Sequence, residues 1–176
     1  MQDDINSPRA YGFEPLLCDE PRILILGTLP GGESLAHQQY YYSSSNRIWR
    51  VLCQLTWESP PIDYPQKKAF LARHHIALWD YYESAIRPGS NDTAIRDGRP
   101  NDIIAFMIQH PTIKVIAING FGKYRDFGAQ IKKKLATIPA LTDVKVLRLP
   151  ETSGCNQNYG WSDLNKLSAE WRQIFD

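Results

Sequence analysis

Cysteine is scarce in this sequence, and its scarcity excludes several kinds of site. The three cysteines, Cys18, Cys53 and Cys155, lie far apart and form no Cys-x-x-Cys pair. Zinc and iron–sulfur sites usually draw their ligands from closely spaced cysteines, so we expect neither a metal nor a cofactor. An odd cysteine count in a chain of 176 residues also disfavours a disulfide framework. We therefore expect a reduced, cytoplasmic protein.

Long apolar runs and an excess of one charge are missing as well. No run approaches the roughly 20 residues that cross a bilayer, and the acidic start Met1–Asp4 lacks the apolar segment of a signal peptide. We therefore expect no membrane association. Lys and Arg number 20 against 19 Asp and Glu, which gives a net charge of +1. This balance argues against a strongly basic DNA-binding protein but allows a small basic site.

The composition that is present is typical of a globular protein. Hydrophobic residues make up 43% of the chain and charged residues 22%, and both values are ordinary for soluble domains. Because no repeat or linker divides the sequence, we expect residues 1–176 to form a single domain and a monomer. Three prolines and one glycine interrupt residues 1–21, which predicts a loosely structured lead-in.

Short apolar runs alternate with helical patterns. Strands are predicted over residues 22–27, 76–79, 113–118 and 144–149. The continuous apolar runs are typical of strands buried on both faces, whereas residues 144–149 alternate in part. Apolar residues recur at helical spacing around residues 46–55, 101–107, 127–135 and 164–174. Asn101 and Ser162 are the expected N-caps of two of these helices. The alternation predicts an α/β fold, a three-layer sandwich with a central, mainly parallel four-stranded sheet flanked by helices.

The ligand crevice of such a sheet lies beyond the carboxyl ends of its strands. Gly27–Gly32 follows the first strand and lets the backbone approach a ligand closely, although an ordinary strand-ending turn also explains it. It is neither a GxGxxG fingerprint nor a phosphate-binding P-loop. Pro150–Asn156 follows the last strand and is small and polar. It suits insertion into a groove, or simply connects a strand to a helix.

An aromatic segment stands between these two loops. Tyr40–Tyr42 is followed by Ser43–Ser45 and Asn46. Tyrosine rings can stack on nucleic-acid bases, while the alternative is a tyrosine-rich loop packed on the surface. Asn46 taken alone would be a helix cap.

Five segments together resemble one family. In chain order they are GTLPG, SLAHQQYYYSSSNRIW, LWDYYESAIRPGSNDTAI, AINGFGKY and LPETSGCN. They are similar to segments of the uracil-DNA glycosylase superfamily. Within it they most resemble the hypoxanthine-DNA (deoxyinosine) glycosylase family, with the mismatch-specific uracil-DNA glycosylases as cousins. The resemblance extends from about Ile23 to the C-terminal helix.

The sequence also departs from these families. Leu29 stands where the mismatch-specific cousins have the asparagine that positions the attacking water. Ser43–Ser45 stand where the hypoxanthine-type family has His-Pro-Arg, just before the asparagine that Asn46 matches. In the last loop, Glu151 replaces a serine and Gly154-Cys155 replaces Pro-Ala. These departures bear on base preference.

The resemblance implies a monofunctional DNA glycosylase of base excision repair whose partner is DNA containing a deaminated base. Such an enzyme flips the base and hydrolyses its N-glycosidic bond, with hypoxanthine the first choice and uracil or xanthine next. Asn46 is implied to be catalytic by orienting the water or the base edge. The implied base pocket consists of Gly27, Thr28, Leu29, Pro30, Gly31, Tyr41 and Asn119. The residues implied to contact DNA are Ser153, Gly154, Cys155 and Asn156.

Other polar residues and other functions stay open. Asp80 is either a second polar member of the pocket or a cap, and Arg87, Ser90 and Lys123 are candidate phosphate contacts. One alternative function is a catalytically weak or inactive DNA-binding relative. Another is a small-molecule nucleoside hydrolase, which would act on free nucleosides, because a fold alone does not determine function.

Overall fold

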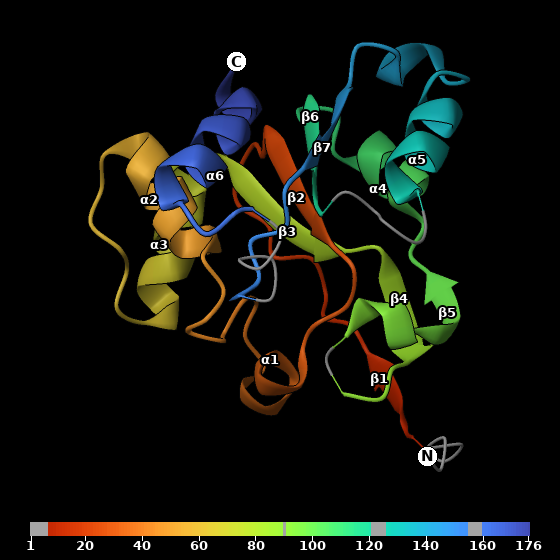
Figure 1. The fold of residues 1–176 in the computed structure, drawn as a ribbon. Coiled ribbons are helices and arrows are strands. Elements are labelled where there is room, and N and C mark those ends of the chain that lie inside the picture. The colour runs from red at the N-terminus through yellow and green to blue at the C-terminus, as the bar shows by residue number, and fades with distance from the viewer. Residues whose placement is uncertain (1–6, 90, 121–125, 155–159) are drawn as a thin grey trace.

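The computed structural model describes residues 7–89, 91–120, 126–154 and 160–176. Its elements form three layers, with a central sheet between two groups of helices (Figure 1). The helices are α1 Gly32–His37, α2 Ile48–Thr56, α3 Tyr64–Arg73, α4 Ile103–Gln109, α5 Phe127–Leu135 and α6 Leu164–Trp171. This arrangement confirms the predicted α/β sandwich.

Four parallel strands make up the central sheet, in the order β3-β2-β6-β7. They are β2 Ile23–Gly27, β3 Ile76–Asp80, β6 Val115–Asn119 and β7 Lys145–Leu149, and they confirm the four predicted strands. Continuous apolar runs form such strands because helices cover both faces of a parallel sheet.

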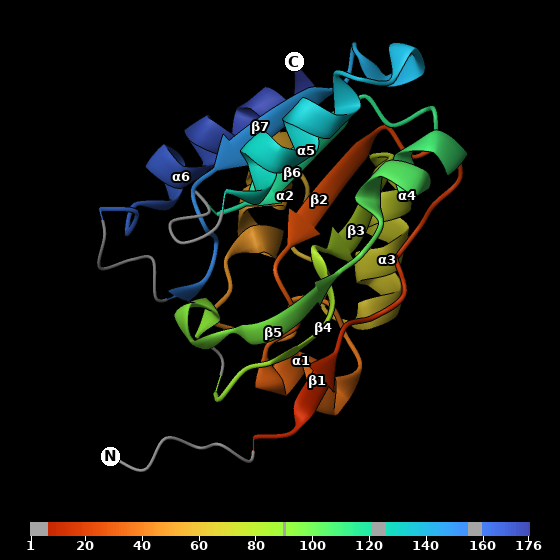
Figure 2. The same ribbon diagram turned by 90° about the vertical axis from the view of Figure 1, so that its right-hand side faces the viewer.

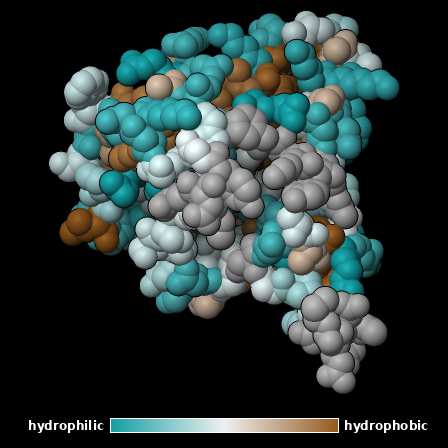
Figure 3. All heavy atoms as spheres, in the orientation of Figure 1, coloured by the Kyte–Doolittle hydropathy of each residue, from teal (hydrophilic) through white to brown (hydrophobic). Residues whose placement is uncertain are grey.

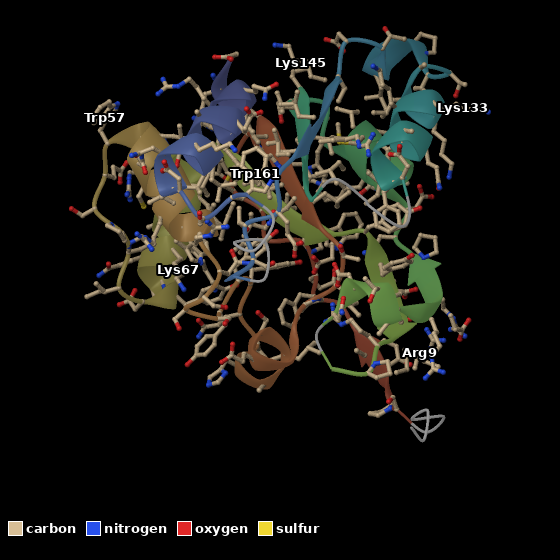
Figure 4. The ribbon with its side chains drawn as sticks, viewed as in Figure 1. Arg9, Trp57, Lys67, Lys133, Lys145 and Trp161 are labelled. Carbon is tan, nitrogen blue, oxygen red and sulfur yellow. The ribbon has the colours of Figure 1, made fainter. Side chains whose placement is uncertain are left out.

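Alternate strand residues face two separate cores, because successive side chains of a strand point to opposite faces. Ile25 and Leu78 pack with α2, α3 and α6, whereas Leu24 and Ile116 pack with α4 and α5. The helices present polar faces outward. Lys133 of α5 points away from the molecule in Figure 4, as expected for the solvated side of an amphipathic helix.

A second, antiparallel sheet is not predicted by the sequence patterns. Its order is β1-β4-β5, with β1 Arg9–Tyr11, β4 Tyr82–Ile86 and β5 Arg96–Pro100. Figure 2 shows it beyond the carboxyl ends of β2 and β3. These strands are short and carry few consecutive apolar residues, so no buried run marks them. The second sheet lies at the edge of the molecule where a ligand is expected.

The described part of the predicted loose lead-in is more ordered than its prolines suggest. β1 pairs with β4, and the Gly12 N–H donates to the Glu83 carbonyl at 2.7 Å. Arg9 donates to the Ser84 hydroxyl at 3.1 Å and forms an ion pair with Asp97. The prolines flank β1, so they leave its own ladder hydrogen bonds intact.

Two helix caps lie one residue beyond their predicted positions. Asp102 caps α4 by accepting from the Ala105 N–H at 3.0 Å, and Asp163 caps α6 by accepting from the Asn165 N–H at 2.7 Å. The expected caps, Asn101 and Ser162, each precede an aspartate, whose carboxylate is an equally good or better acceptor. Asn101 instead donates to the Asp80 carbonyl at 2.9 Å.

The surface is mainly hydrophilic on the face drawn in Figure 3, where brown apolar areas are small and separate. The most exposed large apolar side chains are Trp57, 91% exposed, and Ile62, 86% exposed, in the connection between α2 and α3. Within the described ranges, no helix combines the length and the apolar character that crossing a membrane requires.

Candidate active site

Segments from distant parts of the chain meet beyond the carboxyl ends of the central strands. Register pairs Gly27 with Asp80 and Asn119 with Leu149 on neighbouring strands. The ends of β2, β3, β6 and β7 therefore lie along one edge of the sheet (Figure 1). This edge is where open α/β sheets bind ligands.

Thr152 is the centre of a hydrogen-bond network at this edge. Its side chain and backbone are completely buried, and its N–H donates to Asn119 Oδ1 at 3.0 Å. Asn119 Nδ2 then donates to Thr152 Oγ1 at 2.9 Å and to Tyr41 Oη at 3.3 Å. Thr152 Oγ1 in turn donates to Asn46 Oδ1 at 2.8 Å. The network joins residues more than 100 positions apart.

The network fixes the orientation of the Asn46 amide. The Ile48 N–H, which can only donate, lies 3.0 Å from Asn46 Oδ1, so this atom must be the carbonyl oxygen. Oδ1 therefore accepts from both Ile48 and Thr152, while Nδ2 donates to none of the described residues. Asn46 thus bonds to the first N–H of α2, as a cap would, and keeps its amide N–H groups available.

Removing the Thr152 hydroxyl is expected to destabilise the protein. Thr152→Val keeps the shape of the side chain but leaves Asn46 Oδ1 and Asn119 Nδ2 each without one partner in a buried setting. We expect the free energy of unfolding to fall by about 1–3 kcal/mol, measured by urea denaturation. Thr152→Ser is the control, and it should retain most of the stability. A valine variant as stable as wild type would contradict this role.

The three consecutive tyrosines occupy three different environments. Tyr40 is a core residue, 4% exposed, whose hydroxyl donates to the Glu14 carbonyl at 3.0 Å. Tyr41 is half-buried in the network and has a φ of +50°, a strained value for a residue other than glycine. Tyr42 is exposed and stacks on His37 with ring centroids 3.7 Å apart. Only Tyr41 therefore faces the site.

The loop after β2 directs its carbonyl groups into the protein. The Gly27 and Thr28 carbonyls accept from the backbone of residues 81 and 82 at 2.8 and 3.0 Å. The Leu29 and Pro30 carbonyls accept from Arg87, and Gly31 precedes α1. In a trans peptide the N–H points opposite to the preceding carbonyl. The N–H groups of Thr28, Leu29 and Gly31 therefore point away from these partners.

Arg87 is buried and holds this loop by hydrogen bonds to its carbonyl groups. Its Nη1 donates to the Leu29 carbonyl at 3.1 Å and to Asp92 Oδ1 at 2.8 Å, and its Nη2 donates to the Pro30 carbonyl. Only 3% of its side chain is exposed. The prediction that Arg87 contacts a DNA phosphate is therefore wrong, because its guanidinium already bonds to groups inside the protein.

The loop after β7 packs against the serine segment that precedes α2. A Cβ on Gly154 would lie 3.0 Å from Ser45 Cβ and 3.2 Å from the Ser45 carbonyl oxygen. The Arg47 N–H donates to the Thr152 carbonyl at 2.8 Å, and the Arg47 side chain donates to the carbonyl of Trp161, which is labelled in Figure 4. Two of the departures from the family pattern, at Ser45 and Gly154, therefore touch each other.

Burial perturbs the ionisable groups at this edge. Asp80 is 4% exposed, and its Oδ2 has no hydrogen-bond partner among the described residues. Burial, helped by the negative charge of Asp92 and opposed by Arg87, raises the pKa of Asp80 from 3.8 to about 7. Burial also raises the pKa of Tyr41 and of Glu151. The Tyr41 hydroxyl is therefore neutral at physiological pH.

The structure brings Tyr41, Asn46, Asn119 and the loop Gly27–Gly31 to one edge, and Ser153 and Gly154 border it. Sequence reasoning missed Thr152, since a threonine in a polar loop carries no signal of burial. The remaining candidates, Cys155, Asn156, Ser90 and Lys123, lie outside the described residues. Where the chain is described, no three or more His, Cys, Asp or Glu side chains group so that they could hold a metal ion.

Known proteins share this sequence pattern. The sequence model of the Uracil DNA glycosylase superfamily matches residues 14–174. A hypoxanthine DNA glycosylase of Methanosarcina acetivorans is 30% identical over 171 residues, which cover 93% of this chain and 96% of that protein. A hypoxanthine DNA glycosylase of Methanosarcina barkeri is 36% identical over 113 residues, which cover 64% of this chain and 72% of that protein.

A solved structure shares the fold. The solution NMR structure of a Methanosarcina acetivorans protein, provisionally described as a uracil DNA glycosylase, matches with a TM-score of 0.76 at 28% sequence identity. The match covers 96% of this chain and 100% of that chain. The family match spans all four central strands and every described segment of the site. The chain belongs to the uracil DNA glycosylase superfamily, and it is a DNA glycosylase.

Proposed function

We propose that this DNA glycosylase is monofunctional and releases hypoxanthine from deoxyinosine in DNA after flipping the base. The observation that carries the proposal is the hydrogen-bond network that links Tyr41, Asn46 and Asn119 through Thr152 at one sheet edge. The similarity to proteins named hypoxanthine DNA glycosylase favours this base. Uracil and xanthine are secondary substrates in this proposal, and the enzyme acts as a monomer without a cofactor.

The reaction breaks the bond between the sugar C1′ and the base nitrogen. The base leaves with the bonding electrons, and water adds to an oxocarbenium-like sugar and loses a proton. Charge therefore develops on the departing base. The N–H groups of Thr28, Leu29 and Gly31 point away from the protein partners of their loop, and they suit stabilisation of this charge. Arg87 keeps the Gly31 N–H oriented by holding the Pro30 carbonyl, and the backbone N–H groups of Tyr81 and Tyr82 orient the other two by holding the Gly27 and Thr28 carbonyls.

In this proposal Asn46 orients the water or the base edge and does not take a proton from water. Its Oδ1 already accepts two hydrogen bonds, and a neutral amide does not take a proton from water at pH 7. The remaining N–H groups can donate to the water oxygen or to the base. Holding the reactants in this way lowers the entropic part of the barrier. Asn119 and Thr152 fix its position.

The flipped base would stack on the ring of Tyr41. Asn119 holds this ring in place by donating a hydrogen bond to the Tyr41 hydroxyl. The loop of Ser153, Gly154, Cys155 and Asn156 would contact the DNA from which the base departs. A lyase would need an amine nucleophile. In this proposal water is the nucleophile and no amine takes part, so the enzyme is monofunctional.

Base release from defined duplexes tests the proposal. The chain is incubated in EDTA with duplexes that carry deoxyinosine, uracil or xanthine, and with a deoxyadenosine control. We expect free hypoxanthine to accumulate, and strand breaks to arise only after alkali. Absence of release from all three damaged duplexes would contradict the proposal, and breaks without alkali would contradict monofunctional action. Release of hypoxanthine from free inosine alone would indicate a nucleoside hydrolase. Binding to the damaged duplexes without release of a base would indicate an inactive relative.

A further inference from the structure

Positive charges gather where α2 and α6 begin, next to the hydrogen-bond network of the site. Arg47 directly follows Asn46, and its backbone N–H donates to the Thr152 carbonyl at 2.8 Å. Arg50 follows in the first turn of α2, and Lys166 lies in the first turn of α6. Cations from two distant parts of the chain therefore border the edge of the sheet that holds Asn46.

The turn formed by Gly160 and Trp161 links the Arg47 and Lys166 side chains. Arg47 Nη1 donates to the Trp161 carbonyl. Lys166 Nζ donates to the Gly160 carbonyl at 3.2 Å and lies 4.9 Å from the centroid of the Trp161 ring. Trp161, labelled in Figure 4, therefore marks the place where both cations meet.

Arg50 lies on the side of α2 that faces α6. Gln54, four residues after it, donates to Asn165 Oδ1 of α6 at 2.5 Å, and residues four apart lie on one face of a helix. Arg50 is exposed, and its positive charge adds to burial in lowering the pKa of Arg47. The two guanidinium groups are therefore close enough to repel each other.

No described carboxylate forms an ion pair with Arg47, Arg50 or Lys166. Asp163, which is close in sequence, caps α6 by accepting from backbone N–H groups. Arg47 is 4% exposed, and its buried Nε and Nη2 have no hydrogen-bond partner among the described residues. Burying a charge without a partner is costly, and like charges nearby add to that cost. The cluster therefore points to a bound anion as the missing partner.

We propose that Arg47, Arg50 and Lys166 bind a backbone phosphate of the DNA strand that carries the flipped base. The position of the base in this assignment rests on the proposed function. Nε and Nη2 of a guanidinium form a fork that matches two phosphate oxygens, while the exposed Arg50 and Lys166 attract the strand. Phosphate contacts position a duplex without reading its sequence. The cluster is thus the small basic site that a net charge of +1 allows.

The salt dependence of duplex binding tests this site. Dissociation constants are measured by fluorescence anisotropy between about 50 mM and about 200 mM salt, for a deoxyinosine duplex and the same duplex with deoxyadenosine. Arg50→Gln and Lys166→Gln each remove one exposed charge. Each should weaken binding to both duplexes about tenfold at the lowest salt. Each should also lower the slope of the logarithm of the binding constant against that of the salt concentration by about 1.

Lys133→Gln is the matched control, because Lys133 lies on α5, which packs on the opposite face of the central sheet from α6; it should keep the wild-type slope. Arg47→Lys keeps the charge and loses the fork, so binding should weaken while the slope stays unchanged. If Arg47→Lys does not fold, the two exposed variants decide.

A duplex with one neutral linkage locates the phosphate. Methylphosphonate replaces each phosphate next to the deoxyinosine in turn. At one linkage it should weaken wild-type binding about tenfold, and that of Arg50→Gln less than about twofold, because the contact is already lost. Wild-type slopes in both glutamine variants, or additive losses at every linkage, would overturn the site. Failure of wild type to release any base would contradict the proposed function instead, and the binding slopes would still decide the phosphate site.

Discussion

Asn46→Asp should lower the single-turnover rate of hypoxanthine release at least about 100-fold, the effect of losing one donor that stabilises a transition state. Aspartate keeps an oxygen for the Ile48 N–H and the Thr152 hydroxyl, so the local fold is retained. It removes both amide N–H groups and places a negative charge beside a departing anion. The measurement uses excess enzyme over a deoxyinosine duplex at pH 6 to pH 7.

Two further variants separate chemistry from structure. Asn46→Ala also removes the bond to the first N–H of α2 and should cost about 1 kcal/mol of stability in addition to activity. Asn165→Asp makes the same charge change on the exposed side of α6 and should leave the rate unaltered. An Asn46→Asp rate equal to or above wild type would show that the side-chain oxygen takes a proton from water, contrary to the orienting role.

Asp80→Asn should stabilise the protein at alkaline pH. The folded pKa of about 7 exceeds the ordinary 3.8, so the folded state binds the proton more tightly than the unfolded state. The contribution to stability is complete below about pH 4 and is lost as pH rises to about 7. The shift corresponds to about 4 kcal/mol. Urea denaturation from pH 4 to pH 9 should therefore show a growing advantage for the variant, up to about that size.

The sign of this effect distinguishes Asp80 from an ordinary surface acid. The ion pair with Lys114 lowers the pKa of Asp143, so Asp143→Asn should lower stability at neutral pH or leave it unchanged. An advantage for Asp80→Asn that is the same at every pH would indicate better packing rather than ionisation. The expected advantage means that the buried carboxyl of Asp80 costs the folded protein stability at alkaline pH, as is common at functional sites.

The fold could be predicted for those helices and strands whose burial produces a regular pattern of apolar residues in the sequence. β2, β3 and β6 carry continuous apolar runs and β7 alternates in part, while α2, α5 and α6 repeat apolar residues with helical period, so sequence alone indicates them. β5, Arg96–Pro100, has charged residues and a terminal proline, and it joins a sheet only because β4 lies beside it. Its pairing depends on tertiary contacts that no local pattern encodes.

The candidate site was predictable in part. The resemblance pointed to Tyr41, Asn46 and Asn119, and the structure places them in one network. Thr152 could not be identified, because its importance lies in hydrogen bonds to residues 33 and 106 positions away. Arg87 was misjudged for the same reason, since a charged residue near a loop normally faces solvent, and its burial depends on the carbonyls it binds.

The position of β2 in the sheet has a consequence for how the chain is made. β2 emerges first of the four central strands, yet its two neighbours, β3 and β6, begin only at residues 76 and 115. Until β6 has left the ribosome, one edge of the apolar strand Ile23–Gly27 has no partner, and such edges promote aggregation. A message truncated before residue 119 should therefore yield an insoluble fragment rather than a weak enzyme.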